Sequence, residues 1–173
     1  MTIGEGLLAL IVARSKNNVI GKKGRIPWFI EGEQKQFKEL TTGNIVIMGR
    51  CTYQEIGHPL PGRQTIVVSK SQKYDGENLK SAESLEMALK ISRRNEEEAH
   101  PQDIFIAGGY ELYKAAIPLV DTMYITEVDI TIEDGDTFFP IFNIEDFDLE
   151  IGEKAGKDIK YTRTIYKRKV LHQ

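Results

Sequence analysis

Residues 104–118 read IFIAGGYELYKAAIP, a short apolar run followed by two glycines and a helical segment that Pro118 ends. A continuous apolar run of this kind is expected for a strand covered on both faces. Gly108 and Gly109 stand where the strand would pass into the helix. The stretch therefore predicts one strand–turn–helix unit of an α/β protein.

Similar units recur along the chain. Other strands are expected at residues 7–13, 45–48, 65–68 and 122–130, with a brief one at 78–80. Alternating residues at 147–151 and 161–169 predict an antiparallel hairpin. The expected fold is α/β, with a central mostly parallel sheet, helices on both faces and a C-terminal antiparallel hairpin, in one domain spanning residues 1–173.

Helices are expected between these strands. The first would end near Gly43 as a C-cap, and a short one is expected at residues 52–56. Ser81 would cap a helix that carries Leu85 and Leu89. The polar stretch at residues 93–103 is expected to be a solvated loop.

Composition restricts the class of protein. The chain has 173 residues, 40% hydrophobic and 28% charged, which is typical of a globular domain. A net charge of −3 argues against nucleic-acid binding, and the single cysteine against a Cys-based metal cluster. The apolar N-terminal run resembles a buried strand more than a signal peptide, and no run reaches membrane-spanning length. A cytoplasmic monomer without a metal site is expected.

Glycines and polar residues follow the expected parallel strands. They occur at residues 21–28, 49–50, 69–70 and 108–109. Ligands of such sheets bind beyond the carboxyl ends of the strands, so this pattern predicts a nucleotide-type cofactor site. The chain has neither a GxGxxG nor a GxxxxGK[ST] motif, which argues against a standard Rossmann fingerprint or an NTPase loop.

Three groups of hydrogen-bond donors could hold phosphates. They are Gly108-Gly109, Arg50 with Thr52, and Ser69 with Lys70, which Lys80 could join. Each alone is compatible with an ordinary surface position, but together they suit a dinucleotide with an extra phosphate. Cys51 is either a thiol activated at a helix start or a small packed side chain.

An acidic residue occupies an unexpected place in the stretch VIGKKGRIPWFIEGEQKQFKEL, residues 19–40. At helical spacing, Glu33 shares one stripe with Phe37 and Leu40. A first-turn glutamate is usually solvated and favoured by the helix dipole. Alternatively, an apolar pocket holds this carboxylate and raises its pKa by desolvation, so that it could bind a nitrogen heterocycle.

Two further side chains have alternative interpretations. Arg63 is either an exposed turn arginine or a guanidinium that grips a substrate carboxylate. Thr126 lies in an otherwise apolar strand and is either a satisfied hydroxyl or a hydrogen-bond partner of Glu33.

Together, these residues resemble the dihydrofolate reductase family. The resemblance rests on an ordered set of motifs between about residue 7 and Pro140: Val19-Ile20-Gly21, Pro27-Trp28, Glu33 with Phe37, Ile47-Met48-Gly49-Arg50, Pro59-Leu60-Pro61-Gly62-Arg63, Gly108-Gly109 and Gly135-Asp136-Thr137-x-Phe139-Pro140.

The resemblance implies NADPH-dependent reduction of 7,8-dihydrofolate to 5,6,7,8-tetrahydrofolate. A hydride would pass to C6 of the pterin, and a water would carry a proton to N5. Glu33 would hold N3 and the 2-amino group, supported by Thr126, while Trp28 would shape the water site. The implied catalytic residues are Glu33, Trp28 and Thr126, and the implied substrate-binding residues are Ile11, Glu33, Phe37, Ile56, Arg63, Ala107 and Thr126.

The resemblance also implies an NADPH site and a cis peptide bond between Gly108 and Gly109. Residues 19–25 would form a lid loop over the nicotinamide. The implied cofactor residues are Ala13, Ile20, Gly21, Lys22, Lys23, Gly24 and Arg25 at the nicotinamide, Gly49, Arg50, Cys51, Thr52, Ser69, Lys70 and Lys80 at the phosphates, and Gly108, Gly109, Tyr110, Glu111, Leu112 and Tyr113 at the pyrophosphate.

The chain departs from the family pattern at four positions. Ile26 stands where some members have methionine, Tyr53 replaces a frequent tryptophan and His58 a common arginine. Without that arginine, a second contact to the glutamate tail is not expected. Ala107 is smaller than the usual side chain, which predicts a looser pterin wall and altered affinity for antifolate inhibitors. The alternatives are a riboflavin-pathway type reductase and a non-catalytic pterin- or nucleotide-binding module.

Overall fold

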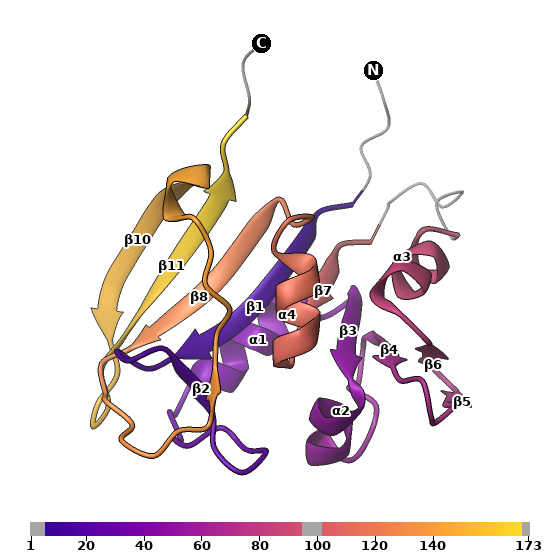
Figure 1. Ribbon diagram of the computed structural model, residues 1–173, viewed down its shortest axis with the longest axis horizontal. Helices are drawn as coiled ribbons and strands as arrows, with labels where there is room; N and C mark the ends of the chain where they lie inside the picture. The colour runs from indigo at the N-terminus through magenta and orange to yellow at the C-terminus, as the bar shows by residue number, and fades with distance from the viewer. Residues whose placement is uncertain (1–5, 95–101, 171–173) are drawn as a thin grey trace.

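A nine-stranded sheet forms the centre of the protein, whose computed structural model describes residues 6–94 and 102–170 (Figure 1). Its strands are β1 (Leu8–Arg14), β3 (Ile45–Gly49), β4 (Gln64–Val68), β5 (Asp75–Gly76), β6 (Leu79–Ala82), β7 (Ile104–Ile106), β8 (Thr122–Val128), β10 (Phe147–Ala155) and β11 (Tyr161–Arg168). The spatial order is β10-β11-β8-β1-β7-β3-β4-β6-β5. Strands from β8 through β6 in this order are parallel to their neighbours, whereas the β8–β11, β10–β11 and β5–β6 pairs are antiparallel.

The expected fold class is thereby confirmed. The apolar runs form strands with nearly the expected bounds because their side chains are buried on both faces of the sheet. Leu10, Ile47, Ile106 and Met123, from four neighbouring strands, are completely buried.

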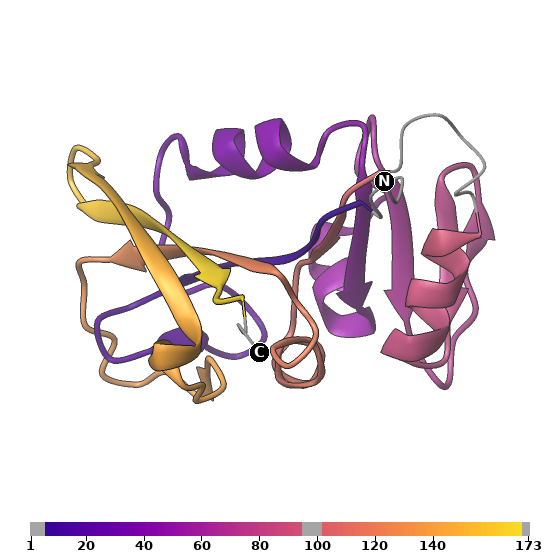
Figure 2. The ribbon, with the colours of Figure 1, turned by 90° about the horizontal axis from the view of Figure 1, so that it is seen from above.

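In the described part of the chain, four α-helices pack around the sheet: α1 (Glu33–Thr41), α2 (Arg50–Ile56), α3 (Leu85–Arg93) and α4 (Tyr110–Ala116). Seen from above, α1 covers one face of the sheet, and α3 and α4 cover the other (Figure 2). Among the described helices, none combines the length and the apolar content that crossing a membrane requires.

Two helix ends differ from the sequence-based expectation. Ser84, not Ser81, caps α3 by accepting a hydrogen bond from the Met87 N–H at 3.1 Å. Ser81 lies within β6, where its hydroxyl instead accepts the Tyr74 N–H. At the end of α1, Thr42 occupies the cap position, and Gly43 follows with a φ of 82°.

Besides β5 at the edge of the main sheet, three strand segments were not expected. β2 (Val19–Gly21) and β9 (Thr137–Phe138) form a separate two-stranded sheet, and β10 extends beyond residue 151 to Ala155. β10 has no alternating burial, because all its residues after Phe147 are exposed. Most of the solvated loop expected at residues 93–103 lies outside the described part of the chain.

Candidate active site

The strand order of the sheet reverses at β1, because the chain adds later strands on both sides of it. This strand lies between β7 and β8, and β3 lies beyond β7. Ligands of open α/β sheets bind at the carboxyl ends of strands near such a switch point. The residues that follow β1, β3 and β7 therefore define the candidate site.

The turns after β3 and β7 are in direct contact. The Gly49 N–H donates to the Gly108 carbonyl at 2.8 Å, and the Gly108–Gly109 peptide bond is cis, as expected. Gly108 has a φ of 109°, and a Cβ there would come within 3.1 Å of the Tyr113 hydroxyl oxygen. The positive φ and the close Tyr113 ring thus require glycine at position 108.

Glu33 begins α1 directly after Gly32, whose φ of 91° is left-handed. The stripe predicted for this helix is present, because Glu33, Phe37 and Leu40 are half-buried. Their neighbours Gln34, Lys35, Lys38 and Glu39 are exposed.

Burial raises the pKa of the Glu33 carboxyl above its ordinary value. The positive charge of Arg163 acts in the opposite direction, as do the polar side chains of Trp28 and Thr126. Thr126 is buried on β8, directly opposite Ala13 of β1. Glu33 is therefore a partly desolvated carboxylate among polar groups and not an ordinary solvated helix residue.

The indole nitrogen of Trp28 is the second notable feature of this pocket. Its Nε1 is buried and forms no hydrogen bond of normal geometry among the described residues, although it lies close enough to Glu33 to lower the pKa of that carboxyl. Trp28 packs against the apolar cluster of Ile30, Val128 and Tyr161. A buried donor without an acceptor is rare in proteins, and here it offers a hydrogen bond to a ligand or a water.

Arg63 is held beside Phe37 at the far end of α1. Its Nε donates to the Pro61 carbonyl at 3.0 Å and its Nη1 to the Thr41 hydroxyl at 3.2 Å. The guanidinium carbon lies 5.8 Å from the centroid of the Phe37 ring. Burial lowers the pKa of Arg63, and no carboxylate of the described residues pairs with it. Arg63 can thus receive an external anion.

The remaining predicted substrate residues lie within β1, directly after β7 and at the end of α2. Ile11 and Ala107 are half-buried, and the Ile11 carbonyl accepts the Tyr113 hydroxyl at 2.8 Å. The Ala107 N–H donates to the Ile47 carbonyl. Ile56 is half-buried at the end of α2. Burial, followed by the charge of Glu33, raises the pKa of Tyr113, which keeps this hydroxyl neutral.

The loop at residues 19–25, which is predicted to be a lid, is fastened to the segment before β9. The Lys23 N–H donates to the Asp136 carboxylate at 2.8 Å, and the Asp136 N–H donates to the Gly21 carbonyl at 3.1 Å. Lys22 also forms an ion pair with Asp134. Asp136 therefore holds the lid loop through two backbone contacts.

Replacing Asp136 with alanine should release the lid loop, because the Lys23 N–H loses its charged acceptor. We expect trypsin to cut after Lys22, Lys23 and Arg25 about tenfold faster, as the loss of a hydrogen bond to a charged group implies. Asp134→Asn is the matched control, since its ion pair with Lys22 is exposed and contributes little. Equal cleavage rates in the two variants would contradict this role.

The same contact has a pH dependence. The Lys23 N–H, followed by the Thr137 hydroxyl, lowers the pKa of Asp136. A carboxyl whose folded-state pKa is lowered stabilises the folded loop above its ordinary pKa, and this contribution disappears as the pH falls through the lowered value. Tryptic cleavage is unsuited to that range, so amide exchange of Lys23 is the appropriate measurement.

The predicted phosphate residues are only partly brought together. Arg50, Cys51 and Thr52 form the first turn of α2, and a Cβ on Gly109 would lie 3.9 Å from the Thr52 hydroxyl oxygen. Ser69 and Lys70 follow β4. Lys80 lies inside β6, opposite Ile66 and away from that strand end. Tyr110, Glu111 and Leu112 form the first turn of α4, with Leu112 buried and the other two exposed.

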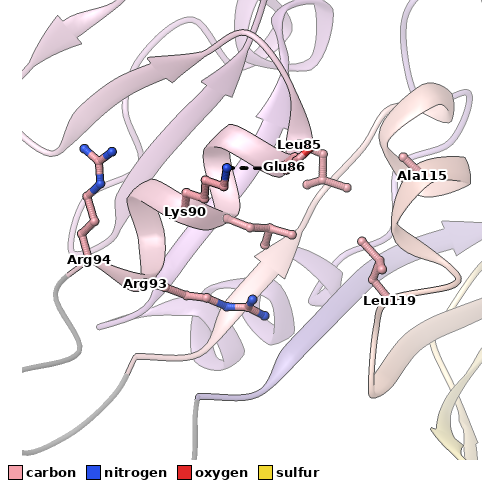
Figure 3. A pocket seen from close by; sticks show the side chains of 8 residues that line it. Leu85, Glu86, Lys90, Arg93, Arg94, Ala115 and Leu119 are labelled. Carbon is pink, nitrogen blue, oxygen red and sulfur yellow. Dashed lines mark ion pairs between the residues drawn. The ribbon is translucent and has the colours of Figure 1, made fainter.

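A cavity of about 740 Å³ lies apart from this site, between α3 and α4 (Figure 3). Its lining residues are Leu85, Glu86, Leu89, Lys90, Arg93, Arg94, Ala115 and Leu119. None of the predicted site residues lines this cavity, which places it outside the candidate site.

Sequence reasoning missed one residue near Glu33. Arg163 comes from β11, 130 positions along the chain, and its charge acts on the Glu33 carboxylate. It stands in an alternating strand, where nothing in the sequence distinguishes it from a solvated arginine.

Comparison with known proteins identifies the family. The family model described as dihydrofolate reductase matches residues 7–169. Dihydrofolate reductase type A13 from Escherichia coli is 37% identical over 161 residues, covering 92% of this chain and 93% of that protein. Dihydrofolate reductase from Haemophilus influenzae is 40% identical over 155 residues, covering 88% and 92%.

A solved structure agrees with these relatives. Dihydrofolate reductase from Enterococcus faecalis, complexed with NADP(H) and RAB-propyl, superposes with a TM-score of 0.80 and 32% identity, covering 95% of this chain and 97% of that one. On the evidence of the family model, these relatives and this structure, the chain belongs to the dihydrofolate reductase family.

Proposed function

We propose that this protein reduces 7,8-dihydrofolate to 5,6,7,8-tetrahydrofolate, with hydride delivered to C6 of the pterin and a water-borne proton to N5. The observation that carries the proposal is the Glu33 carboxylate, which is desolvated in a pocket next to the strand-end turns. Members of the family are NADP-dependent oxidoreductases, and the reductant is NADPH.

The strand-end turns suit a dinucleotide phosphate. Both α2 and α4 start after a glycine, Gly49 and Gly109, without a side-chain cap. The first N–H groups of a helix lack partners within the helix and favour anions. Arg50 and Lys70 form no ion pair with described residues and would hold the phosphates, while Ala13 and the lid loop would enclose the nicotinamide. When bound, NADPH supplies the hydride.

Glu33 would bind and polarise the pterin. A carboxylate can accept hydrogen bonds from N3 and the 2-amino group of the ring, and the Thr126 hydroxyl would support it. The raised pKa of Glu33 favours a shared proton between the carboxyl group and the bound ring. This polarisation makes N5 easier to protonate.

Trp28 would hold the water that carries the proton. Its buried Nε1 forms no hydrogen bond of normal geometry among the described residues and can donate to a water oxygen. Such a water would lie close to Glu33 but at a separate position on the pterin edge. Trp28 would thus orient the proton-carrying water, and Glu33 would supply the negative charge that polarises the pterin.

Arg63 and Phe37 would recognise the rest of the substrate. Phe37 and Ile56 are half-buried and present apolar surface to the aromatic rings. The Arg63 guanidinium is fixed by Pro61 and Thr41 and can pair with a carboxylate of the glutamate tail.

The direct test is the decrease in NADPH absorbance when dihydrofolate is added. We expect turnover that a methotrexate-like antifolate blocks. Tight binding of both ligands without turnover would instead assign a non-catalytic binding module. Turnover of a pyrimidine from the riboflavin pathway but not of dihydrofolate would assign the related reductase.

Replacing Ala107 with isoleucine should change the affinity for antifolates. Ala107 is half-buried directly after β7, so a larger side chain would narrow the pterin wall. We expect a change of about tenfold in inhibitor Kd, equivalent to one or two buried methylene groups. Unchanged dissociation constants would show that position 107 does not form this wall.

The protein is further proposed to act as a single-domain monomer in the cytoplasm. One sheet joins β1, near the start of the chain, to β8 and β11 near its end, which supports a single domain. Light scattering coupled to gel filtration would test the monomer, and cell fractionation would test the location.

A further inference from the structure

We propose that Arg163 is a positioning residue for Glu33, which reaches from β11 across Thr126 to the turn that begins α1. This inference rests on the proposed function, since it assigns Glu33 to the reaction.

The register of the sheet places Arg163 beside the site. Ala13 of β1 pairs with Thr126 of β8, and Thr126 pairs with Arg163 of β11. Directly paired residues of neighbouring strands project from the same face of a sheet. Thr126 acts on Glu33 of α1, so Arg163, in the same row as Thr126, projects from the face that α1 covers.

The guanidinium group contacts the residue directly before Glu33. Its Nη2 donates to the Gly32 carbonyl at 3.3 Å. Gly32 has left-handed backbone geometry and offers no side-chain cap to α1. The turn at Gly32, which orients Glu33, is thus held by the Arg163 side chain of β11.

Apolar and aromatic groups hold Arg163 in this position. The guanidinium carbon lies 5.2 Å from the centroid of the Tyr161 ring, two residues earlier on the same strand. Tyr161 is buried with Ile30 and Val128, next to Trp28.

Unsatisfied donors concentrate around Glu33. Three buried side-chain polar atoms form no hydrogen bond of normal geometry among the described residues, and two of them, Trp28 Nε1 and Arg163 Nε, belong to side chains that act on Glu33. Leaving a buried N–H without an acceptor is unfavourable. Such a cost at two neighbouring side chains is expected where polar groups serve a ligand and not the fold.

Arg163 is the only cation known to act on Glu33 in the described part of the chain. The other groups that face this carboxylate are the neutral side chains of Trp28, Thr126 and Tyr113. Glu127, next to Thr126, instead pairs with Arg14. The charge of Arg163 lowers the pKa of Glu33 against the effect of burial, so it limits how far the pKa rises.

Two substitutions separate the charge from the geometry. Arg163→Gln removes the charge, and its shorter side chain also loses the contact with Gly32. Arg163→Lys retains the charge but loses the planar fork and its stacking on Tyr161. The matched control is Lys167→Gln, which removes an exposed cation of the same strand that pairs with Glu150.

The measurement is the pH profile of kcat for NADPH-dependent dihydrofolate reduction. For Arg163→Gln, we expect the limb where the rate falls with rising pH to move to higher pH. For Arg163→Lys, this limb should stay near the wild-type position while kcat decreases. Lys167→Gln should match the wild type. An unmoved limb in Arg163→Gln would overturn the proposal, and so would the failure of both Arg163 variants to fold, which would assign the residue to stability.

A second readout is independent of turnover. Titration of the ligand-free protein by ¹³C NMR of glutamate carboxyl carbons, assigned with Glu33→Gln, reports the ionisation of Glu33 directly. An upward shift in Arg163→Gln supports the proposal even if the wild type does not reduce dihydrofolate, in which case only the proposed function fails. No shift would reject the influence of Arg163 whatever the activity.

Discussion

Replacing Glu33 with glutamine is expected to lower turnover of dihydrofolate at neutral pH by a factor of roughly 10² to 10⁴, the usual contribution of a positioned acid–base group. Glutamine retains the size and one oxygen acceptor of the side chain. It cannot carry the negative charge that stabilises a protonated pterin. Initial rates with NADPH and dihydrofolate at saturating concentrations are the measurement.

Glu39→Gln is the control for this loss. Glu39 lies on the exposed side of the same helix, so its replacement changes the net charge equally without touching the pocket. Its turnover should equal that of the wild type. A Glu33→Gln variant that retains most of its activity would remove Glu33 from the mechanism.

The pH dependence of stability should distinguish a loss of function from a loss of fold. The folded-state pKa of Glu33 is raised, so the ionised carboxylate in the pocket destabilises the fold once the pH exceeds the ordinary glutamate value. Glu33→Gln removes this effect. Its Tm at neutral pH should therefore equal or exceed that of the wild type while its activity is low.

Replacing Arg63 with lysine is expected to weaken dihydrofolate binding by about 2 kcal/mol, or roughly thirtyfold in Kd, as for breaking a buried charged hydrogen bond. Lysine keeps the charge but loses the fork that pairs with a carboxylate and the planar contact with Phe37. Quenching of the Trp28 fluorescence by the ligand would measure the affinity.

The control for Arg63 is a change of ligand. A dihydropterin without the glutamate tail has no carboxylate to pair with Arg63, so its Kd should be nearly the same for the wild type and Arg63→Lys. An equal loss for both ligands would show that the substitution disturbs the pocket through Pro61 and Thr41 instead.

Sequence patterns predicted the parts of the fold that burial determines. The strands β1, β3, β4 and β7 are short apolar runs, and few other structures can bury such runs on both sides. The Glu33 stripe was predictable for a similar reason, because the helical period alone places Phe37 and Leu40 on its side of α1.

Other predictions failed where the sequence allows more than one local structure. Ser81 and Ser84 are both suitable helix caps, and the choice depends on β6, which takes Ser81 into the sheet. β2 and β9 are two or three residues long and contain little apolar pattern. Their pairing depends on contacts between the lid loop and Asp136, more than a hundred positions away.

Long-range register also hid Arg163. Arg163 lies near Glu33 because Ala13, Thr126 and Arg163 are paired across three neighbouring strands. No periodicity within a single segment of the sequence indicates this pairing. The resemblance to dihydrofolate reductases supplied the roles of the other site residues, but this arginine lies outside the motifs that carry it.

The position of β11 inside the sheet has a consequence for the order of synthesis. β11 is translated after all the other described strands, yet it lies between β10 and β8 and not at an edge. While a ribosome is still making the chain, the strands β1, β3, β4 and β7 are available to pair before β11 exists. The carboxylate pocket cannot be complete at that stage, because both Tyr161 and Arg163 arrive with β11. A nascent chain would therefore be able to assemble the strand-end turns for the dinucleotide well before it could hold the pterin.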